Sequence, residues 1–181
     1  MLYSREHNEM LELAEKHDMA SGLYDTDYDM LLKYSDMIAP RGVYVEIGVS
    51  NGFSLLSVAK HRKDIQCYGI ENENKVAVDI ISKEQVSNAT FIFGHSSTVA
   101  KSWEAPIDLL FIDGDHKLPQ IAFDVIGWFP HVKPGGYILF HDYEVDVKET
   151  VEQLIGHNKY HVYLPAIEDI ISTSLAIIKK L

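Results

Sequence analysis

From residue 41 onward, short apolar runs that end in glycine or a polar residue alternate with stretches whose apolar residues recur at helical spacing. The runs typical of strands cover residues 41–48, 65–70, 89–94, 107–113 and 135–142. Helical spacing follows at residues 54–61, 74–85, 120–129 and 145–155. Two further apolar runs have no long helix between them and predict a hairpin of strands at 160–164 and 173–179.

The first 40 residues have only helical patterning. One helix is predicted at residues 4–18, and a second is predicted at 31–39, where Pro40 ends it. The acidic stretch 24–29 is expected to connect the two helices.

Parallel strands need long crossover connections, so strands that alternate with helices predict a mostly parallel sheet with helices on both faces. We therefore expect an α/β, Rossmann-like fold with a seven-stranded, mostly parallel sheet and one antiparallel edge strand. The chain has no internal repeat and no Pro/Ser linker, which predicts a single domain over residues 1–181. Within it, residues 1–39 would form an N-terminal helical cap and residues 40–181 the core.

The charge balance narrows the class of partner. The 181 residues include 16 Lys+Arg and 27 Asp+Glu, which gives a formal net charge of −11 and disfavours a nucleic-acid partner. Cys67 is the only cysteine, so an intrachain disulfide and a cysteine zinc cage are excluded. No apolar run approaches the roughly 20 residues that span a bilayer, and the N-terminus lacks the apolar core of a signal peptide. A cytoplasmic protein without a membrane partner is expected.

Ligands of such sheets bind outside the carboxyl ends of the strands. After the first strand, Glu46, Gly48 and Gly52 form a turn into a helix, whose free N–H groups can bind an anion such as a carboxylate. Ser50 and Asn51 interrupt the dinucleotide pattern G-x-G-x-x-G, and no phosphate-binding P-loop is present. A tight turn without ligand-binding function is the alternative interpretation.

Two later strand ends could complete a nucleoside site. Glu71 follows the second strand, 23 residues after Gly48, where an acidic residue accepts hydrogen bonds from both hydroxyls of a ribose. His95 and Ser96 end the third strand, where an adenine edge would lie. Glu71 alone could equally be a solvated loop residue, but together with the glycine turn it favours the ribose interpretation.

Ionisable residues gather after the fourth and fifth strands: Asp113, Asp115, His116, His141, Asp142 and Glu144. Carboxylates that converge raise one another's pKa unless a cation compensates. A divalent cation with Asp113 and Asp142 as oxygen ligands is therefore predicted. Two polar loops with capping aspartates are the alternative.

In the residues of these strand ends, the chain resembles the class I S-adenosylmethionine-dependent methyltransferases. The segment EIGVSNGFS matches the E-x-G-x-x-x-G-x-S turn of small-molecule O-methyltransferases, including the catechol type. In that family the turn faces the methionine portion of the cofactor, and the serine that corresponds to Ser54 holds its carboxylate. The resemblance also implies ribose recognition by Glu71 and adenine contacts from His95 and Ser96. The cofactor-binding set it implies is Glu46, Gly48, Ser50, Gly52, Ser54, Glu71, His95, Ser96 and Asp113.

The segments IDGDH and FHDY resemble a metal-dependent subfamily of the macrocin type. The resemblance places the metal ligands at Asp113, His141 and Asp142. His141 departs from the subfamily, which has a carboxylate there. Magnesium is the expected ion for oxygen ligands, whereas an imidazole ligand shifts the preference toward manganese or another softer metal. Alternatively His141 points away from a magnesium ion, or acts as a base in a metal-free enzyme.

The implied reaction transfers the sulfonium methyl group of S-adenosylmethionine to a hydroxyl of a small-molecule acceptor. His116 is the first choice for the general base, because histidine as a residue type can exchange a proton near neutral pH, and Asp115 is the second. The resemblance also allows a homodimer paired through N-terminal segments. An NAD(P)-dependent oxidoreductase on a similar sheet and a catalytically inactive nucleotide-binding module are the alternatives.

Overall fold

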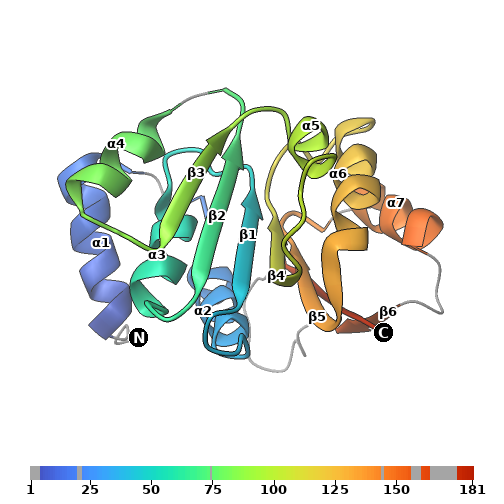
Figure 1. Cartoon of the computed structure of the whole chain (residues 1–181), viewed down its shortest axis with the longest axis horizontal. Helices are drawn as coiled ribbons and strands as arrows, with labels where there is room; N and C mark the ends of the chain where they lie inside the picture. The colour runs from blue at the N-terminus through green and yellow to red at the C-terminus, as the bar shows by residue number, and fades with distance from the viewer. Residues whose placement is uncertain (1–4, 20–21, 74, 144, 156–159, 164–174) are drawn as a thin grey trace.

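The computed structural model describes residues 5–19, 22–73, 75–143, 145–155, 160–163 and 175–181 (Figure 1). The strands are β1 (Val43–Ile47), β2 (Gln66–Glu71), β3 (Ala89–Phe93), β4 (Ile107–Ile112), β5 (Val132–Phe140), β6 (Tyr160–Tyr163) and β7 (Ala176–Lys180). The helices are α1 (Arg5–His17), α2 (Asp25–Ser35), α3 (Phe53–His61), α4 (Val76–Lys83), α5 (Ser96–Ala100), α6 (Gln120–Trp128) and α7 (Val145–Ile155). A short 3-10 helix, η1 (Phe129–His131), precedes β5.

The strands lie in the order β3-β2-β1-β4-β5-β7-β6. The first five pair in parallel, whereas β7 runs antiparallel to β5 and to β6. The predicted α/β class with a mostly parallel sheet is therefore confirmed, and the last two strands pair antiparallel as predicted. Strands β2 and β3 follow on one side of β1, whereas β4 and β5 follow on its other side, so the order of the strands reverses between β1 and β4. The carboxyl ends of these two parallel strands therefore flank the expected ligand crevice.

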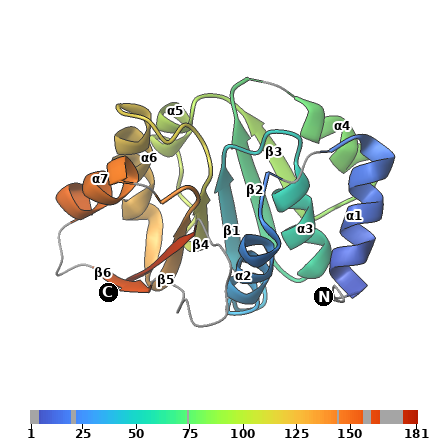
Figure 2. The ribbon, with the colours of Figure 1, turned by 180° about the vertical axis from the view of Figure 1, so that it is seen from behind.

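Alternate residues of the central strands pack into two separate apolar layers. On β1, Tyr44 belongs to one cluster and Val45 to the other, and both are completely buried. The first cluster contains residues of α1, α2, α3 and α4, and the second contains residues of α5, α6 and α7. Figures 1 and 2 show these two groups of helices on opposite faces of the sheet. The predicted helices on both faces are confirmed.

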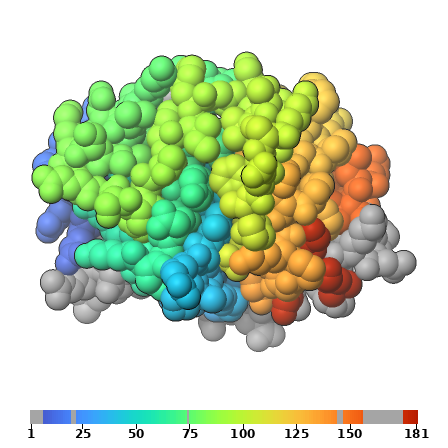
Figure 3. Space-filling model, viewed as in Figure 1, coloured from blue at the N-terminus to red at the C-terminus, as the bar shows by residue number. Residues whose placement is uncertain are grey.

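The N-terminal helical segment packs against one face only. Helix α1 lies behind the sheet in the view of Figure 1, and in the space-filling view its residues emerge only at the margin. Figure 3 shows that the front surface is formed largely by segments between β2 and β5. None of the helices that the structure describes is long and apolar enough to cross a membrane.

Helix α2 differs from the prediction and matters for the site. It begins at Asp25 and ends at Ser35, so the acidic stretch predicted to be a connection forms its first turns. Asp25 and Asp27 stabilise this end by interaction with the helix dipole. The fully buried Asp27 and Leu31 also face the protein interior. Tertiary packing thus overrides the polar pattern that suggested a loop.

The loops after β1 and β4 touch at Gly48. Its φ of +86° is left-handed, and a Cβ added there would lie 2.3 Å from the carbonyl oxygen of Asp113. Only glycine permits this approach. The close packing brings the glycine turn and the aspartate of the fourth strand into one crevice.

Candidate active site

A cavity of about 430 Å³ lies at the carboxyl ends of β1, β2, β3 and β4, a volume typical of small-molecule sites. Helix α6 closes one side with Gln120 and Asp124. The predicted site residues that line the cavity are Gly48, Ser50, Glu71, His95, Ser96, Asp113 and Asp115. The structure therefore brings the glycine turn, the predicted ribose acceptor and the aspartate of β4 to a single cavity.

Glu71 organises the loops around the predicted nucleoside region. Its Oε2 accepts a hydrogen bond of 2.9 Å from the backbone N–H of Ser50. Its Oε1 accepts bonds of 2.8 Å from the backbone N–H groups of Asn72 and Glu73. An ionised carboxylate offers about four acceptor positions, so Glu71 holds both loops in place and retains acceptor capacity toward the cavity.

Glu46 and Ser54 lie behind the glycine turn and not on the cavity lining. Ser54 Oγ donates a hydrogen bond of 2.5 Å to Glu46 Oε1, and the hydroxyl of Tyr44 donates one of 2.6 Å to Oε2. Burial raises the pKa of Glu46 to about 8, although these two hydrogen bonds oppose the shift. Gly52 caps α3 with a φ of +94°. These residues therefore stabilise the turn from its buried side.

A buried carboxylate on α6 was missed by the sequence analysis. Asp124 is 1% exposed and lines the cavity. Its Oδ1 accepts hydrogen bonds from Ser96 Oγ and from Gln120 Nε2, the latter at 3.0 Å. Its buried Oδ2 has no hydrogen-bond partner among the described residues. Burial raises the pKa of Asp124 to about 6. The signal was available, because Asp124 is the one acidic residue in the otherwise apolar stretch 120–129.

His95 and Ser96 surround the same end of the cavity. His95 Nδ1 lies 3.1 Å from the amide nitrogen of Asn72 on the next loop. Ser96 Oγ accepts a hydrogen bond of 2.7 Å from the indole N–H of Trp128 while it donates to Asp124. The Ser96 hydroxyl is thus occupied within the chain and acts on the cavity by holding Asp124.

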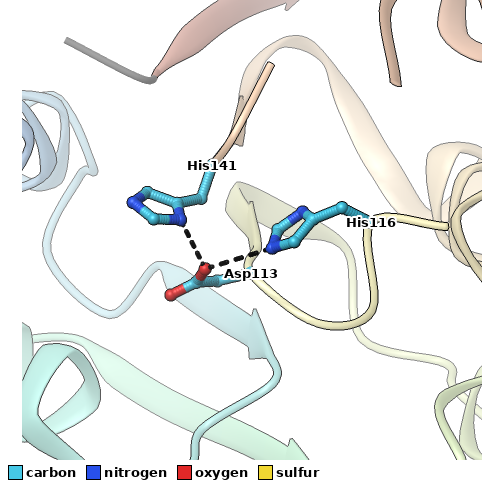
Figure 4. A group of neighbouring side chains, drawn as sticks. All are labelled: Asp113, His116 and His141. Carbon is cyan, nitrogen blue, oxygen red and sulfur yellow. Dashed lines mark ion pairs between the residues drawn. The ribbon is translucent and has the colours of Figure 1, made fainter. Parts of the chain in front are cut away.

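The second group of predicted residues lies beside Asp113, where β4 and β5 end (Figure 4). His141 Nδ1 is 2.9 Å from Asp113 Oδ1, and His116 Nε2 is 3.9 Å from the same oxygen. One ligand-type atom from each of Asp113, His116 and His141 lies within 4.8 Å of the others. The side chains therefore converge on one point, as Figure 4 shows.

Asp142 and Asp115 flank this cluster. Asp142 Oδ2 lies 3.6 Å from His116 Nε2, and its Oδ1 lies 3.6 Å from His141 Nδ1. The φ of Asp142 is +48°, a left-handed conformation that aspartate tolerates better than most residues. Asp115 is exposed and accepts a hydrogen bond of 3.0 Å from the backbone N–H of Lys117. Glu144 lies outside the described residues.

A fully buried aspartate faces the far side of the His141 ring. Asp27 Oδ2, on α2, lies 3.7 Å from His141 Nε2. Burial alone would lower the pKa of His141, but Asp113 and Asp27, with Asp142, raise it to about 10. Sequence reasoning could not find Asp27, because it belongs to an acidic stretch more than 100 residues away in the chain.

The residues fit a divalent cation. Both ring nitrogens of His141 are buried and face carboxylates, Nδ1 that of Asp113 at 2.9 Å and Nε2 that of Asp27 at 3.7 Å. Histidines that bind metals commonly have such a carboxylate beside the ring. Asp113, His116, His141 and Asp142 supply oxygen and nitrogen donors of the kind that hold such ions.

A family described as "Methyltransferase domain" matches residues 45–143, more than half of the chain. The chain belongs to this family. The identification as a class I S-adenosylmethionine-dependent methyltransferase, predicted from the glycine turn, is thereby confirmed. The match favours this enzyme class over the nicotinamide-dependent alternative.

A relative from Acanthamoeba polyphaga mimivirus, named only as an uncharacterized protein, is 32% identical over 113 residues. The match covers 56% of this chain and 51% of the relative, so the chain spans about half the length of this curated relative.

Solved structures share the fold at low identity. The O-methyltransferase TomG from Streptomyces achromogenes, solved with S-adenosylmethionine, has a TM-score of 0.74 at 14% identity, covering 99% of this chain and 91% of TomG. An rRNA methylase from Streptococcus thermophilus has a TM-score of 0.65 at 16% identity, and the match covers 86% of this chain and 95% of the methylase. A precorrin-6y C5,15-methyltransferase from Geobacter metallireducens has a TM-score of 0.69 at 12% identity, and the match covers 89% of this chain and 93% of that enzyme. Because three kinds of acceptor occur on this fold, the fold does not identify the acceptor.

Proposed function

We propose that this chain transfers the methyl group of S-adenosylmethionine to a hydroxyl of a small molecule, with assistance from a divalent cation. The observation that carries the proposal is that one cavity and one cluster of ionisable residues share Asp113. The glycine turn, Glu71 and Asp113 line the cavity, and Asp113 also contacts His116 and His141 beside it. A cofactor bound in the cavity would direct its methyl group toward the cluster.

The cofactor side offers specific hydrogen-bond acceptors. Glu71 would accept from the ribose hydroxyls, as acidic residues after the second strand do in related sheets. The unpaired Oδ2 of Asp124 would accept from an amino group such as that of adenine. Gly48 and Ser50 bring backbone close to the methionine portion, with Glu46, Gly52 and Ser54 supporting the turn from behind.

On the acceptor side, the substrate oxygen would bond to the methyl carbon while the carbon–sulfur bond breaks and its electron pair stays on sulfur. The hydroxyl proton would pass to His116 or Asp115, which both belong to the solvent-accessible loop after β4. Asp113, His141 and Asp142 are the predicted ligands of a divalent cation, with magnesium expected and a softer metal as the alternative. When bound, such an ion supplies a Lewis acid that lowers the pKa of the acceptor hydroxyl.

The acidic charge supports a small-molecule acceptor over a polyanion. At a net charge of −11, the chain lacks the excess of positive charge that attracts a phosphate backbone. A cytoplasmic location and a homodimer remain part of this proposal.

The proposal is tested by calorimetry and a methyl-transfer screen. S-adenosylhomocysteine should bind with one-to-one stoichiometry, whereas NAD(H) should not bind. Release of S-adenosylhomocysteine should depend on an added acceptor, from a panel of catechols, sugars and other hydroxylated molecules. Binding of NAD(H) alone would refute the methyltransferase function, and turnover only on amines or on RNA would refute the hydroxyl acceptor.

A further inference from the structure

We propose that Asp113, His116 and His141 form a binding site for a transition-metal dication of the manganese-to-zinc series, and that Asp27 positions His141 for it. This inference deepens the proposed function and rests on it for the role of the ion in methyl transfer. Binding of the ion can nevertheless be measured without any turnover.

His141 is the strongest indication of a bound ion. The residue is 7% exposed, and each of its two ring nitrogens faces a carboxylate, Nδ1 that of Asp113 and Nε2 that of Asp27. Figure 4 shows one ring nitrogen directed at Asp113, and the distance from Nδ1 to Oδ1 is 2.9 Å. A buried histidine whose ring nitrogens are both directed at carboxylates is arranged as metal-binding histidines commonly are.

His116 reaches the same point from the loop after β4. Its Nε2 lies within 4.8 Å of the ligand atoms of Asp113 and His141, and its ring is only partly exposed. Two imidazoles and one carboxylate therefore converge, with Asp113 and His116 coming from the loop after β4 and His141 from the end of β5. In this assignment His116 is a ligand, and Asp115 is left to accept the proton of the substrate.

Asp27 lies on the opposite side of the His141 ring. Its carboxylate is fully buried, and Oδ2 lies 3.7 Å from Nε2, while Nδ1 faces Asp113. Histidines that bind metals commonly direct their second nitrogen at a carboxylate, which fixes the ring orientation and strengthens the ligand. Helix α2 would thus contribute to the metal site through Asp27, although it lies outside the segment that matches the family.

The donor set decides the kind of ion. Magnesium prefers oxygen ligands and gives up its water reluctantly. Imidazole suits zinc, copper, iron and nickel, and affinity along the divalent series rises from manganese toward copper. Two nitrogen donors and one oxygen donor therefore favour the transition ions over magnesium.

The experiment uses the full chain after treatment with a chelator. Calorimetry with Co²⁺, Zn²⁺, Mn²⁺ and Mg²⁺ should show one site, with Co²⁺ and Zn²⁺ binding at least about tenfold tighter than Mg²⁺. The visible absorption of Co²⁺ reports nitrogen ligands directly. We expect His116→Asn to alter this spectrum and to weaken Co²⁺ binding about 100-fold, and Asp27→Asn to weaken it about tenfold.

The control is His61→Asn, since His61 also pairs with a carboxylate, that of Asp36 at 2.8 Å, but lies at the end of α3. It should bind Co²⁺ as the unchanged chain does. An unchanged spectrum and affinity in His116→Asn would overturn the ligand set and indicate an adventitious ion only. An unchanged affinity in a folded Asp27→Asn chain would overturn the positioning role.

Circular dichroism measures the folded fraction of each variant. If Asp27→Asn lowers that fraction, His116→Asn still tests the site, because the side chain of His116 is partly exposed and its replacement should not unfold the chain. Methyl transfer without binding of any transition ion would refute this inference and leave the proposed function intact. Tight Co²⁺ binding without binding of S-adenosylhomocysteine would refute the proposed function alone.

Discussion

The two sides of the crevice differ in how their polar groups are satisfied. On the side of β1 and β2, Glu71 accepts three backbone hydrogen bonds and Glu46 accepts two from side chains. On the side of β4 and β5, the ring nitrogens of His141 form ion pairs with Asp113 at 2.9 Å and with Asp27 at 3.7 Å. The first side is held in shape by hydrogen bonds within the chain, whereas the second is held by ion pairs that a bound cation could replace. In the proposed function, the first side would be a preorganised cofactor site and the second a reaction centre that is incomplete until the ion binds.

The largest effect is expected on the incomplete side. Asp113→Asn removes the carboxylate that faces both histidines, so methyl transfer should fall at least about 100-fold, because positioned acid, base and metal groups contribute effects of this size. The rate of S-adenosylhomocysteine release measures this loss. Asp79→Asn, at an exposed position on α4, is the control and should keep full activity. Equal activity of the two variants would contradict the assignment of the reaction centre to Asp113.

Gly48→Ala should damage the contact between the two sides. A Cβ there would overlap the carbonyl of Asp113, and the left-handed φ adds backbone strain, so the free energy of unfolding should fall by roughly 2–4 kcal/mol. Urea unfolding measures the change. Gly135→Ala is the matched control, because Gly135 has a similar φ of +80° with no atom within 4 Å. A loss no larger than that of Gly135→Ala would mean that the loops can separate.

Glu71→Gln should weaken binding of S-adenosylhomocysteine without affecting binding of the metal ion. Hydrogen bonds to a charged group contribute about 1.5–3 kcal/mol, so the affinity for S-adenosylhomocysteine should fall roughly 10- to 100-fold. Calorimetry measures the affinity, and Co²⁺ binding should stay unchanged in the same variant. Glu104→Gln, at an exposed position before β4, is the control. A joint loss of both ligands would show that the two sides are not independent.

The smallest effect concerns the buried support of the glycine turn. The pKa of Glu46 is raised to about 8 in the folded chain, well above its ordinary value of 4.5. Between these values the folded chain holds a proton that the unfolded chain releases, so stability falls as the pH rises from about 5 to 8. The contribution of Glu46 to the slope should be about 1 kcal/mol per pH unit, and Glu46→Gln should remove that contribution. The raised pKa values of Asp124 and His141 leave a smaller slope of the same sign. Urea unfolding at several pH values would contradict this if both chains showed the same slope.

Much of the fold and part of the site could be predicted because they depend on local pattern. The parallel strands follow from apolar runs that alternate with helical stretches, and their polar ends identify Glu71 and Asp113. Helix α2 was misplaced, because the acidic stretch at its start has no apolar periodicity that could distinguish a helix from a loop. Asp124 was missed although its acidic character in an apolar helix was visible.

The alternation of strands and helices, the polar strand ends and the glycine turn could be predicted, since each depends on residues that are neighbours in the chain. Which of these residues meet depends on how the folded chain packs. Packing buries Glu46 and Ser54 behind the turn, and it places Asp27 of helix α2 at the far side of the His141 ring. Contacts between residues so far apart in the chain depend on how the helices pack on the sheet. A local sequence pattern does not show which distant residues will come into contact.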